Sequence, residues 1–187
     1  MSLLTVVQES MVGDYYFELK GKGITGPAGP TGAGYFTPAY GSYISTSTQT
    51  PTANVILPIT YNDVGITPLN ISLFGTAPQH QIRVANTGIY KFLYSIQVDK
   101  APGGGSTADM NVFISINNTP VPQSNSRTEI SNTVSIVLTC EYVLSLNAGD
   151  LVEVDVLTAG TNCSIIAYAA NSAPATPSII SNIYRIA

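Results

Sequence analysis

Residues 81–98 have the sequence QIRVANTGIYKFLYSIQV, and this stretch predicts two strands joined by a tight turn. Residues 81–84 alternate polar and apolar side chains, as expected of a strand that has one face in water. The Asn-Thr-Gly sequence at 86–88 follows, and these residue types favour a turn. The apolar and aromatic run over 89–98 then predicts a second, longer strand. The whole stretch therefore indicates β-structure.

Short runs of the same kind continue on both sides of this stretch, and no segment has the pattern of a helix longer than one turn. A glycine-rich loop is expected at 99–109, and turns are expected at 117–120 and 147–150. Many short strands at regular spacing are typical of a sandwich, barrel or jelly roll. Further strands are predicted at 54–57, 71–74, 111–116, 134–138, 142–146, 151–157, 164–168 and 179–186.

The composition agrees with an all-β domain and excludes several other classes of protein. Of 187 residues, 44% are hydrophobic and 10% are charged, with 7 Lys plus Arg against 11 Asp plus Glu. A nucleic-acid-binding protein would need clusters of basic residues to neutralise phosphates, and this chain has none. No apolar run approaches the ~20 residues that span a bilayer, so we expect no membrane span.

A glycine recurs at every third position between residues 23 and 34, with proline after two of these glycines. Glycine in this phase is what a collagen triple helix requires, because only glycine fits at the crowded axis. The alternative is a Gly/Pro-rich linker that keeps the same register. Four triplets cannot hold three chains together, so a collagen-like stem would need a trimeric head. The residues of this predicted stem are Gly23, Gly26, Pro27, Gly29, Pro30 and Gly32.

The repeats divide the chain into three parts. Residues 1–22 are predicted to be an anchor segment, residues 23–34 a collagen-like stem, and residues 35–187 the β-rich head. Three tyrosines, Tyr35, Tyr40 and Tyr43, follow the stem closely, where three chains would diverge into the head. Tyrosine combines apolar area with a polar tip and suits subunit interfaces, so these residues are candidates for a trimer interface. The alternative is that they are ordinary strand tyrosines.

Residues that could support catalysis are few. His80 is the only histidine, and it lies where a surface loop is expected to enter a strand. The Gly103–Gly105 run lacks the lysine and helix of a phosphate-binding loop. The sequence also has no Gly-x-Ser-x-Gly nucleophile motif. We therefore expect no catalytic residue, no cofactor and no enzymatic activity.

Carboxylates and cysteines raise two further questions. A calcium site at Asp99 and Asp109 is conceivable, because calcium prefers several oxygen ligands, but solvated loop carboxylates are the favoured interpretation. Glu153 and Asp155 are two residues apart on one predicted strand.

Cys140 and Cys163 lie in predicted strands, and two buried free thiols are favoured over a disulfide.

Two segments resemble the C1q/TNF-like jelly-roll family. Residues 81–92 resemble its strand–turn–strand signature, in which a glycine turn leads into an aromatic-rich strand, and residues 144–152 resemble a later signature with a Gly-Asp turn. A narrower resemblance, to phage and large-DNA-virus structural proteins of this fold, rests on residues 95–100, 117–127 and 174–183. A looser one is to collagen-like surface proteins of bacterial spores.

The resemblance implies a homotrimeric jelly-roll sandwich preceded by a collagen-like stem. Its implied function is that of a non-enzymatic virion structural protein, a spike, fibre or minor capsid component at the particle surface, with host attachment as a further role. Residues 1–22 would bind other virion or surface-layer proteins, and the head would meet a host receptor or glycan. The alternatives are a spore-surface (exosporium) protein and a carbohydrate-binding head.

Overall fold

The computed structural model describes residues 36–100, 108–130, 135–160 and 163–187. All regular secondary structure in these residues is β, which confirms the predicted all-β class. The described residues contain no helix with the length and apolar character needed to cross a membrane. The predicted anchor (1–22), the glycine triplets (23–34) and Tyr35 lie outside the described residues.

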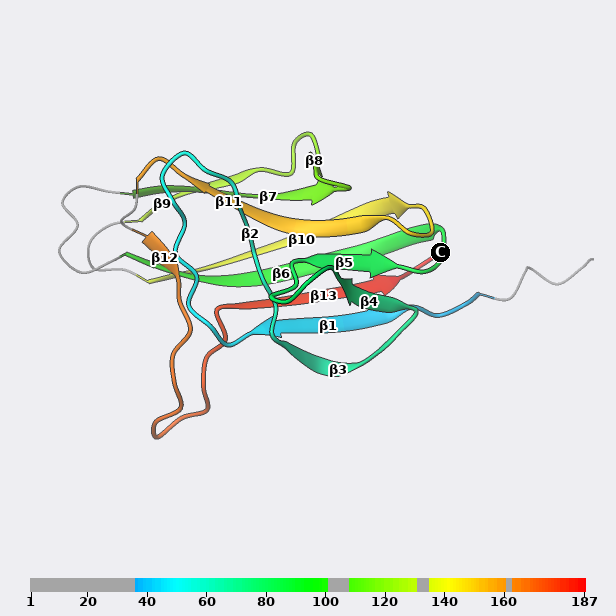
Figure 1. The fold of residues 1–187 in the computed structure, drawn as a ribbon, viewed down its shortest axis with the longest axis horizontal. Coiled ribbons are helices and arrows are strands. Elements are labelled where there is room, and N and C mark those ends of the chain that lie inside the picture. Colours follow the sequence, from blue (N-terminus) through cyan, green and yellow to red (C-terminus); the bar gives the residue numbers. More distant parts are fainter. Residues whose placement is uncertain (1–35, 101–107, 131–134, 161–162) are drawn as a thin grey trace, which may run out of the picture. The chain divides into compact units, whose positions relative to one another are not determined.

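The strands form two antiparallel sheets that make a sandwich (Figure 1). In the first sheet, the order is β10 (Ile136–Leu146), β6 (Gly88–Lys100), β13 (Ile179–Arg185), β1 (Tyr40–Ser45) and β3 (Asp63–Leu69), with β12 (Cys163–Ile165) paired to β6. In the second sheet, the order is β4 (Ile71–Phe74), β5 (Gln81–Val84), β11 (Leu151–Thr158), β7 (Ala108–Ile116) and β8 (Thr119–Pro120). Two further strands extend the second sheet: β2 (Leu57–Pro58) pairs with β11, and β9 (Ser126–Ile130) pairs with β7.

The core lies between the sheets and is built mainly from β6 and β11. Successive side chains of a strand point to opposite faces, so every second residue of β6 can be buried. Five such residues are fully buried: Tyr90, Phe92, Tyr94, Ile96 and Val98. The second sheet contributes the alternate residues Val152, Val154 and Val156 of β11, which are also fully buried. Burial of these apolar side chains is the main force that holds the two sheets together.

Two predicted turns have the backbone geometry that their residues favour. Asn117 and Asn118 connect β7 to β8 with φ of 53° and 61°. A two-residue hairpin turn with positive φ at both positions matches the twist of the strands, and asparagine tolerates this geometry. Gly149, in the turn from β10 to β11, has φ of 95°, which glycine adopts without steric cost.

Several predicted strand limits are wrong. Residues 134–138 and 142–146 were expected as separate strands, but Ile136–Leu146 is one strand, because residues 139–141 remain paired with β6. Of residues 54–57, only Leu57 belongs to a strand. Strand β6 runs to Lys100 and β7 begins at Ala108, so both ends of the predicted loop at 99–109 are extended; residues 101–107 lie outside the described part.

Four strands were not predicted from the sequence. They are β1, β3, β8 and β9, which contain glycine, proline, serine, threonine or charged residues in place of long apolar runs. Their pairing partners in the sheets determine their conformation more than their own residues do, which is typical of β-structure.

The cysteines are unpaired, as favoured from the sequence. Cys163 is fully buried, and Cys140 on β10 is half-buried with its sulfur 3.2 Å from Ser126 Oγ.

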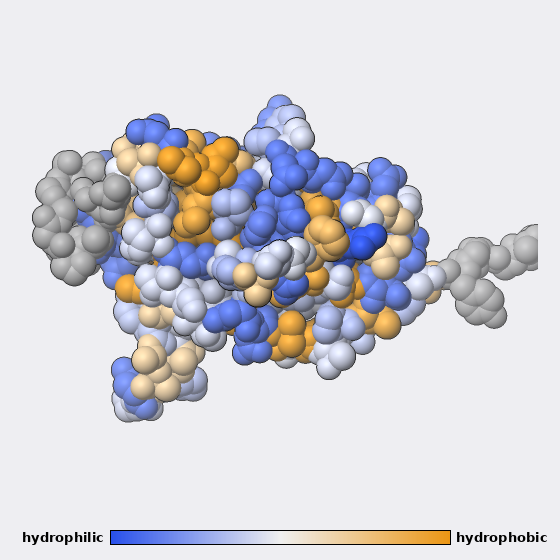
Figure 2. All heavy atoms as spheres, in the orientation of Figure 1, coloured by the Kyte–Doolittle hydropathy of each residue, from blue (hydrophilic) through white to orange (hydrophobic). Residues whose placement is uncertain are grey.

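The surface shown in Figure 2 is mostly hydrophilic or intermediate in hydropathy, and hydrophobic residues gather in separate patches. One patch lies over the segment between β1 and β2, where Val55 and Ile56 are 54% and 47% exposed.

Candidate interaction surface

The first sheet has a second face, which points away from the core and is not covered by any described part of the chain. We call it the open face. The outward side chains of four adjacent strands alternate with the buried ones, and each is at least partly exposed. They are Tyr40, Ser42 and Ile44 on β1; Ile180, Asn182 and Tyr184 on β13; Ile89, Lys91, Leu93, Ser95 and Gln97 on β6; and Val137, Thr139, Glu141, Val143 and Ser145 on β10.

Strand register arranges these side chains in rows across the sheet. One row consists of Tyr40, Tyr184, Lys91 and Val143, which are cross-strand neighbours on four successive strands. Side chains in such positions contact one another directly. Tyr40 is 40% exposed, Tyr184 is 39% exposed and Val143 is 65% exposed, so this row presents aromatic and aliphatic surface to solvent. Apart from Lys91, the row is aromatic or aliphatic, and exposed apolar surface that continues across neighbouring strands favours an interaction surface over a fully solvated face.

The open face also carries one ion pair. Lys91 Nζ on β6 lies 2.7 Å from Glu141 Oε2 on β10. The hydrogen bond to the Glu141 carboxylate raises the pKa of Lys91. The two charges neutralise each other, so the centre of the face has no net charge from this pair. A surface that is nearly neutral and partly apolar can approach an identical surface without strong repulsion.

The three tyrosines predicted at a trimer interface have different outcomes. Tyr40 lies on the open face, and Tyr35 lies outside the described residues. Tyr43 is fully buried in the core, with its ring 6.1 Å from that of Tyr61. Because Tyr40 and Tyr43 are three residues apart on one strand, their side chains point to opposite faces. The structure therefore corrects the prediction for Tyr43, which is a core residue and not an interface residue.

Sequence reasoning did not identify the other members of the row, Tyr184, Lys91 and Val143. Alternation along 89–98 and 136–146 indicates which residues point outward, but it does not show that these strands are neighbours. Their proximity depends on strand order, in which β13 inserts between β6 and β1.

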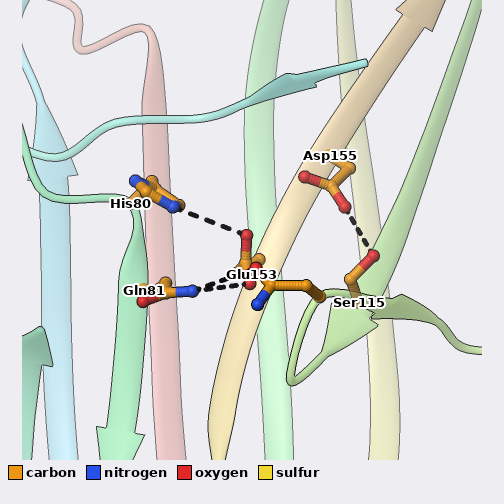
Figure 3. Close-up of polar contacts among 6 residues, drawn as sticks. His80, Gln81, Ser115, Glu153 and Asp155 are labelled. Atoms are coloured by element: carbon orange, nitrogen blue, oxygen red, sulfur yellow. Dashed lines mark hydrogen bonds and ion pairs between the residues drawn. The ribbon is translucent and has the colours of Figure 1, made fainter. Parts of the chain in front are cut away.

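A second group of polar side chains lies on the outward face of the second sheet (Figure 3). Glu153 on β11 is 2% exposed and accepts a hydrogen bond from Gln81 Nε2 at 3.0 Å. His80 Nε2 lies 3.7 Å from the other oxygen of Glu153. Asp155, two residues further along β11 and 4% exposed, accepts a hydrogen bond from Ser115 Oγ.

This polar group does not have the connections of a catalytic triad. Ser115 donates to Asp155, whereas His80 contacts Glu153, so the hydroxyl and the imidazole do not belong to one chain of hydrogen bonds. A nucleophilic site needs the base within hydrogen-bonding reach of the nucleophile. The geometry of these residues therefore supports a structural role.

The carboxylates that were considered for calcium bind separate partners. Asp99 accepts a hydrogen bond from Tyr168 Oη at 2.9 Å, and Asp109 forms an ion pair with Arg127 at 2.6 Å. Within the ranges that the structure describes, no three His, Cys, Asp or Glu side chains are arranged to hold a metal ion.

Asp155 provides a pH-dependent test of the buried polar group. Burial raises the pKa of Asp155, and the hydrogen bond from Ser115 opposes this shift only in part. A raised folded-state pKa means that the folded protein binds the proton more tightly than the unfolded chain, so the free energy of unfolding falls as pH rises through that pKa. We expect Asp155→Asn to remove this part of the pH dependence.

The measurement is urea unfolding of both proteins between pH 4 and pH 8. The free energy of unfolding of Asp155→Asn, relative to wild type, should increase over this interval. Asp63→Asn, at an exposed site, controls for the loss of one negative charge. Parallel pH profiles for Asp155→Asn and wild type would contradict a raised pKa of Asp155 in the folded protein.

Several solved structures have a fold similar to that of this chain. The globular domain of zebrafish complement 1qA protein is similar, with a TM-score of 0.54, 17% identity, and coverage of 81% of this chain and 98% of that chain. Murine APRIL at pH 5.0 is similar with a TM-score of 0.50, 10% identity, and coverage of 80% of this chain and 100% of that chain. The fold is the C1q/TNF-like jelly roll.

The jelly roll confirms the fold that the signatures at 81–92 and 144–152 implied. These segments contain the β5–β6 and β10–β11 connections, where the turns predicted at 86–88 and 147–150 occur. No protein-family model matches the chain, and no curated protein matches it in sequence. At these identities the likeness to solved structures concerns the fold alone, so the function must be argued from the surface of this C1q/TNF-like head.

Proposed function

We propose that this protein is a non-enzymatic structural protein of a virion surface, and that it assembles as a homotrimer through the open face of its jelly-roll head. It would serve as a spike, fibre or minor capsid component, with residues 1–22 attached to other virion proteins. The single observation that carries the proposed assembly is the aromatic and aliphatic row on the open face. That row lies in a head preceded by phased glycine triplets.

The case for self-association rests on two independent features. First, the row containing Tyr40, Tyr184 and Val143 exposes apolar surface that association would remove from water. Second, glycine at every third residue between 23 and 32 suits a structure that needs three chains, and a trimeric head would hold those chains in register. A second and third copy of the same chain are therefore the occupants that both features favour.

The virion assignment rests on the resemblance of residues 95–100, 117–127 and 174–183 to viral structural proteins, together with the stem-and-head arrangement of the sequence. Host attachment through the head is the further role that this arrangement favours. A collagen-like spore-surface protein is the alternative location, because the same architecture would serve there. A stem of this kind would extend the head away from the particle in either setting.

Sedimentation equilibrium of the full chain tests the assembly. We expect a mass of about 59 kDa, three times the 19.7 kDa of one chain. A mass of 19.7 kDa at micromolar concentration would contradict the trimer. Cryo-electron microscopy of intact particles, with labelled antibody against the head, tests the location: label on virions supports the proposal, and label confined to spores supports the alternative.

A further inference from the structure

A cleft lies at one end of the second sheet, on a different part of the head from the open face. Its volume is about 480 Å³, which is in the range of small-molecule sites. One wall is the β4–β5 hairpin and its flanks, and the other is the turn from β10 to β11. The strands β4 and β5 lie beside each other toward the end of the head that carries the C terminus (Figure 1).

Backbone hydrogen bonds join the two walls. Gly149 N donates to Val84 O at 2.8 Å, and Val84 N donates to Asp150 O at 3.1 Å. Ala148 N donates to Thr87 Oγ1 at 3.0 Å. The cleft is therefore preformed, and a ligand would not have to order its walls on binding. Because these backbone groups already have partners, recognition would depend on the side chains that line the cleft.

Arg83 is the charged side chain of this cleft. It is exposed, and its guanidinium lies over the ring of Phe74, 5.5 Å from the centroid. A cation held over an aromatic ring is positioned by that contact while its N–H groups stay available. Among the described residues, no carboxylate forms an ion pair with Arg83, in contrast to Arg127, which is paired with Asp109. The guanidinium thus presents a fork of donors that matches a carboxylate.

Two neutral polar side chains accompany Arg83. Ser72 is the cross-strand neighbour of Arg83, so both side chains point to the same face. Asn70 donates a hydrogen bond from its Nδ2 to Pro38 O at 2.9 Å, and this bond does not use the acceptor capacity of its Oδ1. A hydroxyl and an amide oxygen are suited to the hydroxyl groups of a sugar. The exposed ring of Phe74 adds an apolar surface beside the cation.

From this combination we infer that the cleft is a binding site for a carboxylate-bearing saccharide. Arg83 would hold the carboxylate through paired N–H donors, and Ser72 and Asn70 would bind hydroxyl groups of the same sugar. Such a ligand could come from sialic acid or from a uronic acid, since both have this chemistry. The inference goes beyond the proposed function and does not require the trimer, because the cleft is built from one chain.

Isothermal titration calorimetry of the full chain at low salt tests this site. The probes are N-acetylneuraminate and glucuronate, with the methyl ester of N-acetylneuraminate as an uncharged match. We expect saturable binding of at least one acid, with a dissociation constant of about 1 mM or tighter. The acid that binds identifies the source of the ligand. Loss of one charge-assisted contact in Arg83→Gln should weaken binding about tenfold or more.

Arg127→Gln is the matched control, because Arg127 is an exposed arginine outside the cleft. It should bind the acid as wild type does. No saturable binding of either acid, equal binding of the methyl ester, or unchanged binding by Arg83→Gln would each overturn the inference. Sedimentation of Arg83→Gln separates this result from the proposed function, since the variant should retain the wild-type mass even when binding is lost.

Discussion

Replacing Val143 and Tyr184 together by glutamate is expected to reduce the mass of the protein in solution from about 59 kDa to the 19.7 kDa of a single chain. Both residues belong to the apolar row of the open face and are 65% and 39% exposed. In a trimer the double variant would bring six added carboxylates into or beside the interfaces. Like charges that lose water on association cost several kcal/mol, which exceeds what most single interface contacts contribute.

The variant should remain folded as a monomer, because neither side chain is part of the buried core. Circular dichroism with a β-sheet spectrum and a cooperative thermal transition would establish this. Sedimentation equilibrium of wild type and variant at the same concentration gives the masses. A variant that keeps a mass of about 59 kDa would show that the open face is not the trimer interface.

A matched control uses the other exposed apolar pair. Val55 and Ile56 are 54% and 47% exposed, and they lie in the segment before β2 rather than on the open face. Val55→Glu with Ile56→Glu adds the same two charges to surface of similar exposure. This control should keep the wild-type mass. If it dissociates as well, then added negative charge, and not the position on the open face, causes the loss of assembly.

The second large effect is expected in the core. Phe92→Ala should lower the free energy of unfolding by about 3–5 kcal/mol, the usual loss when a buried phenylalanine becomes alanine. Phe92 is fully buried on β6, the strand that pairs with β10 and β13, and its ring lies 6.3 Å from that of Tyr94. Truncation would therefore leave a cavity lined by residues on several strands, which cannot all move to fill it.

Urea unfolding measures this loss, and the monomeric Val143→Glu, Tyr184→Glu protein is the suitable background, because unfolding there is not coupled to dissociation. Leu93→Ala is the control, since Leu93 is the next residue on β6 and points to the open face. It should cost less than about 1 kcal/mol in that background. Equal losses for the two variants would contradict the assignment of the core to the Phe92 side of β6.

Most of the fold follows from local pattern. Strands β4, β5, β6, β7, β11 and β13 occur close to where apolar runs or alternation predict them, because each buries a regular set of side chains. Strand β3 lies at the edge of the first sheet, and its residues Asp63–Leu69 are mostly exposed. Such a strand has little burial pattern to detect, and its pairing with β1 determines its conformation.

The interaction surface was predictable only in part. Tyr40 was expected at an interface because of its chemistry and its place after the stem, and it does lie on the open face. Tyr43 has the same chemistry and nearly the same place, yet it is buried. The difference is that alternate residues of a strand point to opposite faces. Which of the two tyrosines points inward cannot be assigned until the strand and its buried face are known.

The sequence by itself determined the all-β class, the turns at 86–88 and 147–150, and the small number of residues that could act in catalysis. These properties depend on residue type and short-range spacing, which act locally on the backbone. Only the tertiary structure decided that Tyr40, Tyr184, Lys91 and Val143 form one row, and that Arg83 shares a cleft with the turn at Gly149. Both sites join strands far apart in the chain. Strand order and register arise from the packing of the whole sandwich, so no local pattern contains them.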